Sequence, residues 1–384
     1  MARRILFVSN GHGEAAIADR IAQDVRALDP SIEIDHLPLV GESRATHMLE
    51  VGPREMMPSG GLIAMGNLRN IARDVGSGLI ALTLRQRRFL RRSRGAYDRV
   101  VAIGDVFALL MALAAGAPVV YVGTAKSVRV APYGRGERIV LRRAQRIFVR
   151  DEPTAERLRA QRVVAEAPGN VIVDLFGDED ARADDAVRGF DPAIAVFPGS
   201  RASAYADAGF LLQVLRALAQ SRPALGGVLS IAPLLDIDGF TAKLRAAGMS
   251  IERCEDERIP FIVRDGDRVL ARAWRGTIGP LLTRVQMVIG QAGTANEAAA
   301  AAGVPVVAFE RERDRKSAWY RMRQHGLLGE ALAVLPGDLP SATQGLSALL
   351  DDPQRRAAMG AQGRERMGAP GGARAIAHTL ADGK

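Results

Sequence analysis

Short apolar runs alternate with helical patterns along this chain, and that order restricts the fold to α/β layers with parallel strands. In the first half we expect strands near Arg4–Val8, Glu33–Leu37, Arg99–Ile103, Val119–Val122 and Arg146–Val149. The second half begins with a strand at Ala193–Phe197 and continues through Gly227–Ala232. It ends with a strand, a glycine turn, a helix and a strand over residues 288–309. Two similar α/β halves follow from this order.

The length indicates two domains. A chain of 384 residues is long for one hydrophobic core and sufficient for two, and 48% hydrophobic residues allow both cores to be buried. The segment Gly177–Gly189 is acidic and lacks large apolar side chains, as a linker does. We therefore expect one domain at 1–176, a second at 190–370 and a closing helix within 371–384.

The glycine turn of the second half is suited to an anion. Gly293 and Thr294 stand where a strand ends and a helix begins, so backbone N–H groups and the positive end of the helix dipole meet there. Glu297, in the first turn of that helix, can bind a sugar diol. Gln291 and Asn296 belong to the same turn and are candidate nucleotide-binding residues. The simplest ligand with an anion and a diol is a sugar nucleotide.

A second turn in the same half has related chemistry. The strand at 193–197 runs into Pro198, Gly199, Ser200 and Arg201, which can present N–H groups, a hydroxyl and a guanidinium fork to a diphosphate. The alternative is a plain β-turn closed by a surface arginine. Because open parallel sheets bind ligands outside the carboxyl ends of their strands, the two turns together favour a nucleotide site.

The N-terminal turn permits a competing interpretation. Gly11, Gly13 and Ala16 match the Gly-x-Gly-x-x-Gly/Ala dinucleotide fingerprint, and Asp35 lies near the place of the ribose-binding acid. This match predicts an NAD-dependent dehydrogenase. The anion-binding signals of the second half are at least as strong, however, and a dehydrogenase usually has its substrate domain there.

Three side chains at the strand ends of the first half are candidate catalytic groups. Gly11 and Gly13 can equally line an acceptor cleft in which His12 and Glu14 face the reacting sugar. An isolated histidine is also often structural. Asp105 follows the third strand, and it either caps the next helix or acts as a general base whose pKa is raised by desolvation. The two roles of Asp105 are compatible.

Most of the net charge of +9 comes from one segment. Met56–Gly95 contains eight arginines and a single acid, Asp74, with aliphatic side chains at partly helical spacing between them. Such a segment can dock on anionic lipid head groups, where each basic residue contributes ~1 kcal/mol. The alternative is a core helix with a solvated arginine face. The residues expected to dock are Arg85, Arg87, Arg88, Arg91 and Arg92.

Composition disfavours several other classes. Aromatic residues are only 5% of the chain, and the basic segment is interleaved with aliphatics, so we expect no nucleic-acid partner. The single cysteine, Cys254, excludes an intramolecular disulfide and fits a reducing compartment. Asp236-Ile237-Asp238 has the spacing of a metal-binding Asp-x-Asp but lies far from the glycine turns, so we expect no metal. Ile5–Val8 is too short for a signal peptide, and no run approaches the ~20 apolar residues of a spanning helix.

Five motifs together resemble the lipid-A-disaccharide synthase-related proteins over nearly the full length. They are Ser9–Glu14, Met57–Gly61, Leu82–Gln86, Pro198–Arg201 and Gly293–Glu297. The resemblance implies a GT-B fold, in which two Rossmann-like domains with parallel sheets face an interdomain cleft and a C-terminal helix crosses back to the first domain. It also implies that Asp105 matches a catalytically important aspartate. The residues that would hold UDP are Gly199, Ser200, Arg201, Gly293, Thr294 and Glu297.

The resemblance and the turns together predict an inverting glycosyltransferase. It would transfer an N-acetylglucosamine-type or acylated glucosamine unit from a UDP-sugar to a lipid-linked acceptor, as a cytoplasmic protein on the inner face of the membrane. Asp105 or His12 would take the acceptor proton, and Arg201 with the helix N-termini would stabilise the departing diphosphate, so no cofactor is required. Three alternatives stay open: a UDP-N-acetylglucosamine 2-epimerase-like enzyme, a non-catalytic nucleotide-binding protein at the membrane, and the dehydrogenase.

Overall fold

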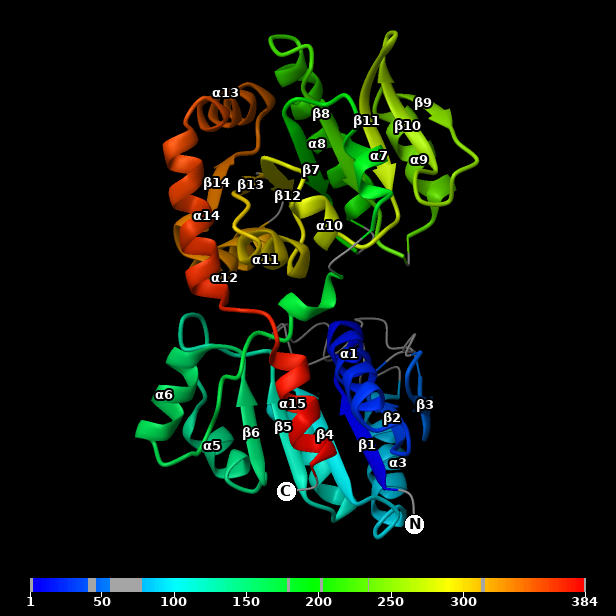
Figure 1. Ribbon diagram of the computed structural model, residues 1–384, viewed down its shortest axis with the longest axis vertical. Coiled ribbons are helices and arrows are strands. Elements are labelled where there is room, and N and C mark those ends of the chain that lie inside the picture. The colour runs from blue at the N-terminus through cyan, green and yellow to red at the C-terminus, as the bar shows by residue number, and fades with distance from the viewer. Residues whose placement is uncertain are drawn as a thin grey trace. The chain divides into compact units, whose positions relative to one another are not determined.

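The computed structural model describes residues 3–40, 46–55, 78–177, 180–200, 203–233, 235–311 and 315–382. Contacts divide the chain into two compact units. Unit 1 consists of Met1–Leu175 and Ala369–Lys384, and unit 2 consists of Phe176–Gly368. Each unit contains one sheet with helices packed on it, as Figure 1 shows. None of the described helices has the length and apolarity that crossing a bilayer requires.

Unit 1 contains a six-stranded parallel sheet with the strand order β3-β2-β1-β4-β5-β6. The strands are β1 Arg4–Ser9, β2 Glu33–Pro38, β3 Leu49–Glu50, β4 Arg99–Gly104, β5 Val119–Gly123 and β6 Arg146–Val149. The five strands expected from the apolar runs are confirmed. The two-residue strand β3 was not expected, because it is too short to have a pattern of its own. The strand order is that of a Rossmann-like sheet.

Helices cover the sheet of unit 1 and complete its core. They are α1 His12–Leu28, α3 Leu79–Arg92, α4 Val106–Ala112, α5 Arg135–Leu141, α6 Glu152–Ala160 and α15 Gly372–Ala381, with 3-10 turns η2 Leu113–Ala115 and η3 Val173–Leu175. Val100 and Ala102 of β4 pack with Leu109 of α4 and Leu90 of α3, all fully buried. A sheet buried by helices on its faces explains why these strands are continuous apolar runs.

The last helix, α15, returns to unit 1 and packs beside α1, as Figure 1 shows. Its first turn is capped by Asp174, whose carboxylate accepts hydrogen bonds from the backbone N–H groups of Gly371 at 2.6 Å and Ala373 at 2.8 Å. At the other end, the guanidinium of Arg99 donates to the carbonyl of Thr379 at 3.0 Å. Both ends of the helix are therefore attached to unit 1.

Unit 2 contains an eight-stranded sheet with the order β14-β13-β12-β7-β8-β11-β10-β9. The strands are β7 Ala193–Phe197, β8 Gly226–Ser230, β9 Ser250–Arg253, β10 Phe261–Asp265, β11 Arg268–Trp274, β12 Met287–Gly290, β13 Val306–Glu310 and β14 Leu332–Pro336. β9 and β10 are antiparallel additions at one edge. The six other strands are parallel and repeat the strand order of unit 1.

The central strand β7 is buried on both faces. The helices of unit 2 are α7 Ala183–Val187, α8 Ala204–Ala219, α9 Ile237–Ala246, α10 Gly279–Leu282, α11 Thr294–Ala301, α12 Arg315–Leu328, α13 Leu339–Leu350 and α14 Pro353–Met367, and η4 is a 3-10 turn at Gly329–Ala331. Ile194 and Val196 pack in one cluster with Leu211 of α8. Ala195 and Phe197 pack in another with the alanines of α11.

The segment expected to be a linker is partly a packed helix. α7 lies within 177–189, and its Ala183 and Ala186 are fully buried against Trp274. The expectation was wrong because alanine can be buried beside a large aromatic ring, so the absence of large apolar residues does not indicate exposure. The division between the units comes earlier, between Leu175 and Phe176.

Replacing Asp174 tests the attachment of α15. Asp174→Ala should lower the free energy of opening of α15 by about 1–2 kcal/mol, because two backbone N–H groups lose their acceptor. Amide hydrogen exchange in α15 measures this energy. Asp382→Ala, an exposed acid just beyond the same helix, should change it by less than about 0.5 kcal/mol. Equal exchange rates in the two variants would contradict the role of Asp174.

Candidate functional site

In each sheet, two turns lie together at the place where the strand order reverses. The strand order reverses between β1 and β4 in unit 1 and between β7 and β12 in unit 2. In open parallel sheets such a reversal leaves a crevice outside the carboxyl ends of the two strands, where ligands bind. The turns singled out in the sequence follow these four strands.

In unit 2 the turn after β7 lies against the turn after β12. The backbone N–H of Gln291 donates to the carbonyl of Phe197 at 2.9 Å, which extends the pairing of the two strands. Gly199 has φ +111°, a conformation that favours glycine. A Cβ at Gly199 would come 3.9 Å from the Cα of Ala292. We call residues 198–200 and 290–293, which the sequence predicts to bind a nucleotide, the nucleotide turns.

The nucleotide turns present the groups that the sequence predicts for an anion. Gly293 precedes α11 and has no side chain to cap it, Thr294 is exposed in its first turn, and Glu297 is half-buried one turn into the helix. Ser200 is also exposed. The N-terminal N–H groups of α11 and its dipole favour a negative charge at this place. Arg201 lies outside the described residues.

Asn296 is inside the turn rather than on its surface. The side chain is fully buried, and its amide donates to the carbonyl of Gly290 at 3.2 Å and to Oε1 of Gln324 at 3.3 Å. Gln324, on α12, donates in turn to the carbonyls of Ala292 at 3.0 Å and Gly293 at 3.1 Å. These two amides hold the turn in shape. Nothing in the sequence pointed to Gln324, because it is 28 residues further along the chain from Asn296.

Gln291 also has a structural contact. Its side-chain amide donates to the carbonyl of Phe309 at 2.9 Å, at the end of β13. The turn after β12 is therefore linked to both of the neighbouring strands, β7 and β13.

In unit 1 two carboxyl groups lie at the ends of β1 and β4. Asp105 caps α4, with Oδ1 accepting from the backbone N–H groups of Phe107 at 3.0 Å and Ala108 at 3.1 Å. Its other oxygen accepts from the side-chain amide of Asn10 at 3.0 Å. Asp105 is therefore a helix cap, as one of the two expectations stated. Asn10 was not among the candidate residues, since asparagine is common in turns.

Glu14 lies in a slot made by two glycines. A Cβ at Gly11 would come 2.7 Å from Oε2 of Glu14, and a Cβ at Gly104 would come 3.0 Å from its Cγ. Both glycines have positive φ, +132° and +120°. Gly104 directly precedes Asp105, so the two carboxyl groups are close neighbours. We call Glu14 and Asp105 the acid pair.

Burial affects the pKa of both members of the acid pair. Burial raises the pKa of Glu14 to about 7, and the neighbouring Asp105 raises it further against a backbone hydrogen bond that lowers it. Burial also raises the pKa of Asp105, and hydrogen bonds from the side chain of Asn10 and from three backbone N–H groups oppose that rise by stabilising its charged form. At neutral pH Glu14 can therefore both release and accept a proton. Such tuning is typical of functional carboxyl groups.

Asp35 does not lie where the ribose-binding acid of the dinucleotide fingerprint is expected. Asp35 is buried in β2 and bonds with the guanidinium of Arg4 at 2.9 Å and the hydroxyl of Tyr97 at 2.8 Å. The carboxyl end of β2 is Pro38, three residues further on. Glu14 in its slot also places a carboxyl group where a pyrophosphate would approach Gly11. These contacts disfavour the dehydrogenase interpretation.

Other residues of the N-terminal turn have clear positions. Gly13 is exposed, with open space around it, and His12 is the first residue of α1, its side chain outside the described set. Ser9 is fully buried and its hydroxyl lies 2.8 Å from Nε2 of His36. Burial lowers the pKa of His36 to about 4, so this imidazole is neutral at physiological pH. The contact between Ser9 and His36 therefore links the end of β1 to the neighbouring strand β2.

The arginines of α3 lie on its exposed side. Gln86 anchors the buried side of the helix by donating to the carbonyls of Leu39 at 3.0 Å and Pro53 at 3.1 Å. Arg85 pairs with Glu55. Arg87, Arg88, Arg91 and Arg92 are exposed and form no ion pair within the described residues. Ile80 and Leu84 are exposed on the same side. The rest of the arginine-rich segment, residues 56–77, lies outside the described residues.

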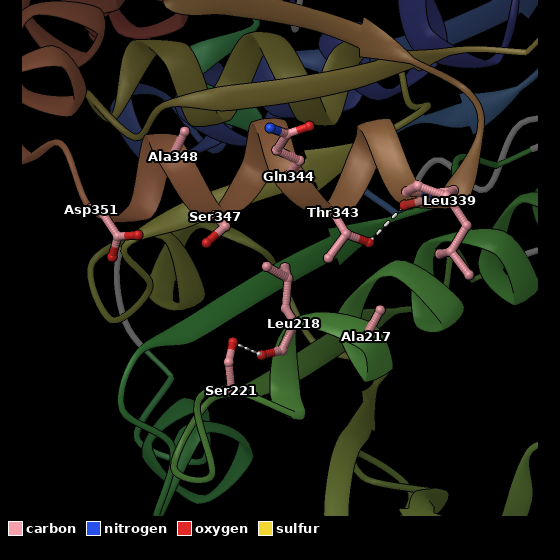
Figure 2. A pocket seen from close by; sticks show the side chains of 10 residues that line it. Ala217, Leu218, Ser221, Leu339, Thr343, Gln344, Ser347, Ala348 and Asp351 are labelled. Atoms are coloured by element: carbon pink, nitrogen blue, oxygen red, sulfur yellow. Dashed lines mark hydrogen bonds between the residues drawn. The ribbon is translucent and has the colours of Figure 1, made fainter.

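A groove among the described residues is separate from these turns. It has a volume of about 670 Å³ and lies between the end of α8 and the helix α13, lined by Leu218, Ser221, Thr343 and Ser347, as Figure 2 shows. α8 starts after the carboxyl end of β7, so its last turn lies toward the opposite edge of the sheet. The lining contains a single acid, Asp351, and no group suited to catalysis.

The described residues also contain no cluster of three potential metal ligands. The Asp236-Ile237-Asp238 motif starts α9: Asp236 caps that helix through the backbone N–H of Gly239 at 2.6 Å, and Asp238 pairs with Arg253.

No protein-family model matches the sequence, and no curated protein is significantly similar to it. Solved structures are similar over the full length. A UDP-N-acetylglucosamine 2-epimerase from Neisseria meningitidis bound to UDP-N-acetylglucosamine is 12% identical, with a TM-score of 0.59 over 99% of this chain and 100% of that one. The UDP-N-acetylglucosamine 2-epimerase from Methanocaldococcus jannaschii is 12% identical, with a TM-score of 0.55 over 98% and 99%. The calicheamicin glycosyltransferase CalG4 is 15% identical, with a TM-score of 0.57 over 98% of each chain.

These similarities show the fold. The chain has the GT-B fold that UDP-sugar epimerases and glycosyltransferases share, as the sequence motifs implied. They do not support the narrower resemblance to lipid-A-disaccharide synthase-related proteins.

The raised pKa of Glu14 predicts a pH-dependent stability. Between about pH 4.5 and 7 the unfolded chain releases the Glu14 proton and the folded protein retains it, so stability falls as pH rises and levels off above pH 7. Glu14→Gln should remove this decline, which is at most about 3 kcal/mol. Denaturant unfolding at pH 5 and pH 8 measures it. As a control, Glu156 is an exposed glutamate on α6, and the stability of the Glu156→Gln variant should decline with pH as that of the unaltered protein does. A decline that persists in Glu14→Gln would contradict the assignment.

Proposed function

We propose that this protein is an enzyme of UDP-N-acetylhexosamines, with 2-epimerase-like chemistry as its main activity. The observation that carries the proposal is the contact between the two nucleotide turns at the strand reversal of unit 2, beside the uncapped start of α11. The comparisons support it, because UDP-N-acetylglucosamine 2-epimerases recur among the similar structures.

In this proposal unit 2 holds the nucleotide. Gly199, Ser200, Gly293 and Thr294 supply N–H groups and hydroxyls to the diphosphate, and Glu297 accepts hydrogen bonds from the ribose diol. Arg201 is proposed as a further diphosphate ligand from the sequence alone. Asn296 and Gln291 act through the shape of the turn, since their side chains bond to backbone carbonyls.

Unit 1 supplies the acid–base chemistry. In epimerisation at C2, the C2 proton is removed while the C1–O bond to UDP breaks, which leaves a C1=C2 double bond. UDP then adds back to C1 and a proton returns to the opposite face of C2, so a proton must be accepted and one returned. The acid pair is suited to this, because Glu14 exchanges its proton near neutral pH and Asp105 lies beside it. Inverting glycosyl transfer requires only that a base accept the proton of an acceptor hydroxyl. No step in either reaction requires a metal or another cofactor.

Glycosyl transfer to a lipid-linked acceptor is the second candidate. The observation that favours it is the surface of α3, where exposed Ile80 and Leu84 stand on the same side as four arginines with no described ion pair. In this candidate Asp105 or His12 would be the base, and the protein would lie peripherally on the cytoplasmic face of a membrane. The similarity to CalG4 also supports it.

A turnover assay in D₂O separates the candidates. With UDP-N-acetylglucosamine and no acceptor, an epimerase should incorporate deuterium at C2 and form the C2 epimer, which NMR detects. Glu14→Gln should reduce the rate at least about 100-fold, because general acid–base groups contribute 10²–10⁴-fold. Glu156→Gln should have the normal rate. The absence of C2 exchange in a protein that binds UDP would reject epimerisation, and release of UDP only with an added lipid-linked sugar would favour transfer.

Binding to vesicles tests the α3 surface. Reversing the charge of Arg87, Arg88 and Arg91 to Glu should weaken binding to anionic vesicles at least about 100-fold, since each basic residue contributes ~1 kcal/mol. A matched variant with Arg135, Arg143 and Arg157 changed to Glu alters three exposed arginines of unit 1 outside α3. Sedimentation with vesicles measures both. If the two triple variants lose equal affinity, the attraction is general and the α3 surface has no special role.

A further inference from the structure

A guanidinium is held rigidly at the carboxyl edge of the unit 2 sheet. Arg311 directly follows β13, the strand next to β12. Its Nη1 donates to Oδ1 of Asp207 on α8 at 3.0 Å, and its plane lies over the ring of Phe210, 5.0 Å from the centroid. Phe210 in turn packs edge-on against the buried Phe309 at 5.4 Å. The side chain is thus held by a carboxylate and by an anchored aromatic ring.

The backbone at Arg311 is also fixed. Gly337, just after β14, approaches so closely that a Cβ there would come 2.2 Å from the carbonyl oxygen of Glu310 and 2.7 Å from the Cα of Arg311. On the other side, Gln291 donates to the carbonyl of Phe309 at 2.9 Å. The position of Arg311 is therefore coupled directly to the nucleotide turn after β12.

Most of the hydrogen-bonding capacity of Arg311 is unused. A guanidinium has five N–H donors. Within the described part of the chain, Asp207 is the one acceptor that Arg311 contacts, and 39% of the side chain is exposed. Asp207 lies in the first turn of α8, the helix that follows the nucleotide turn after β7. Arg311 thus stands beside the elements that carry both nucleotide turns, with several donors free.

We infer that Arg311 binds a phosphate group of the nucleotide, as a ligand additional to the nucleotide turns. The inference rests on the proposed function. The guanidinium is a planar fork whose N–H groups can bind two phosphate oxygens at once. It loses little conformational freedom on binding, because Phe210 and Asp207 already orient it. Asp207 is then a positioning residue. No sequence pattern indicated this role, because an arginine after an apolar run is common in a chain with many arginines.

Binding of UDP, UMP and uridine to Arg311→Gln tests the inference by calorimetry. We expect UDP affinity to fall at least tenfold and uridine affinity to stay within twofold, since uridine has no phosphate. Arg311→Lys should lie between, because it preserves the charge and loses the fork. Asp207→Asn should weaken UDP less than Arg311→Gln does. The UMP arm assigns the phosphate: an equal loss for UMP indicates the α-phosphate, and a loss for UDP alone indicates the β-phosphate.

A matched control is Arg222→Gln. Arg222 is also paired with an acid, Asp351 at 2.7 Å, but it lies beside the groove of Figure 2 near the other edge of the sheet. The Arg222→Gln variant should bind UDP with the affinity of the unaltered protein. If Arg311→Gln binds UDP as well as Arg222→Gln does, or loses uridine equally, the inference is overturned while the proposed function stands. If the unaltered protein binds no UDP, the proposed function itself fails, and the inference fails with it. Unchanged melting temperatures without ligand show that the variants are folded.

Discussion

The pairing of the first and fourth parallel strands is the interaction on which both candidate sites depend. In unit 1 this pairing places Ser9 of β1 opposite Ile103 of β4, and in unit 2 it places Phe197 of β7 opposite Gly290 of β12. The turns that follow these strands are about 95 residues apart in the chain, as the hydrogen bond between Asn10 and Asp105 illustrates. Strand hydrogen bonds bring them together, and helices on both faces exclude water from the strands.

The turns at the strand reversal have opposite electrostatic character in the two units. In unit 2 the first turn of α11 is left without a side-chain cap, so the N–H groups and the dipole favour an incoming anion. In unit 1 the corresponding helix α4 is capped by Asp105, and Glu14 brings a second carboxyl group to the same place. A site with two carboxyl groups, one of which exchanges its proton near neutral pH, suits proton transfer. Under the proposed function, one topology therefore serves nucleotide binding in one unit and acid–base chemistry in the other.

The sequence predicted the central strands of both units because continuous apolar runs are a local property. It also located the nucleotide turns and the strand ends, since strand, glycine turn and helix follow one another directly. It failed where tertiary contacts decide: the short strand β3, the antiparallel edge of β9 and β10, and the burial of Ala183 against Trp274. The inward direction of Asn296 depends on Gln324, which belongs to another helix. No local pattern contains such a partner.

The glycine slot around Glu14 has a consequence for how this protein can vary. A methyl group at Gly11 or Gly104 would require the Glu14 side chain to move, and the positive φ of both glycines disfavours other residues as well. A smaller residue 14 would relieve the contact with its own side chain but not the backbone strain at either glycine, and it would also remove the exchangeable proton. Gly11 and Gly104 are therefore expected to stay glycine among homologues, because their backbone conformation restricts them before selection on activity acts.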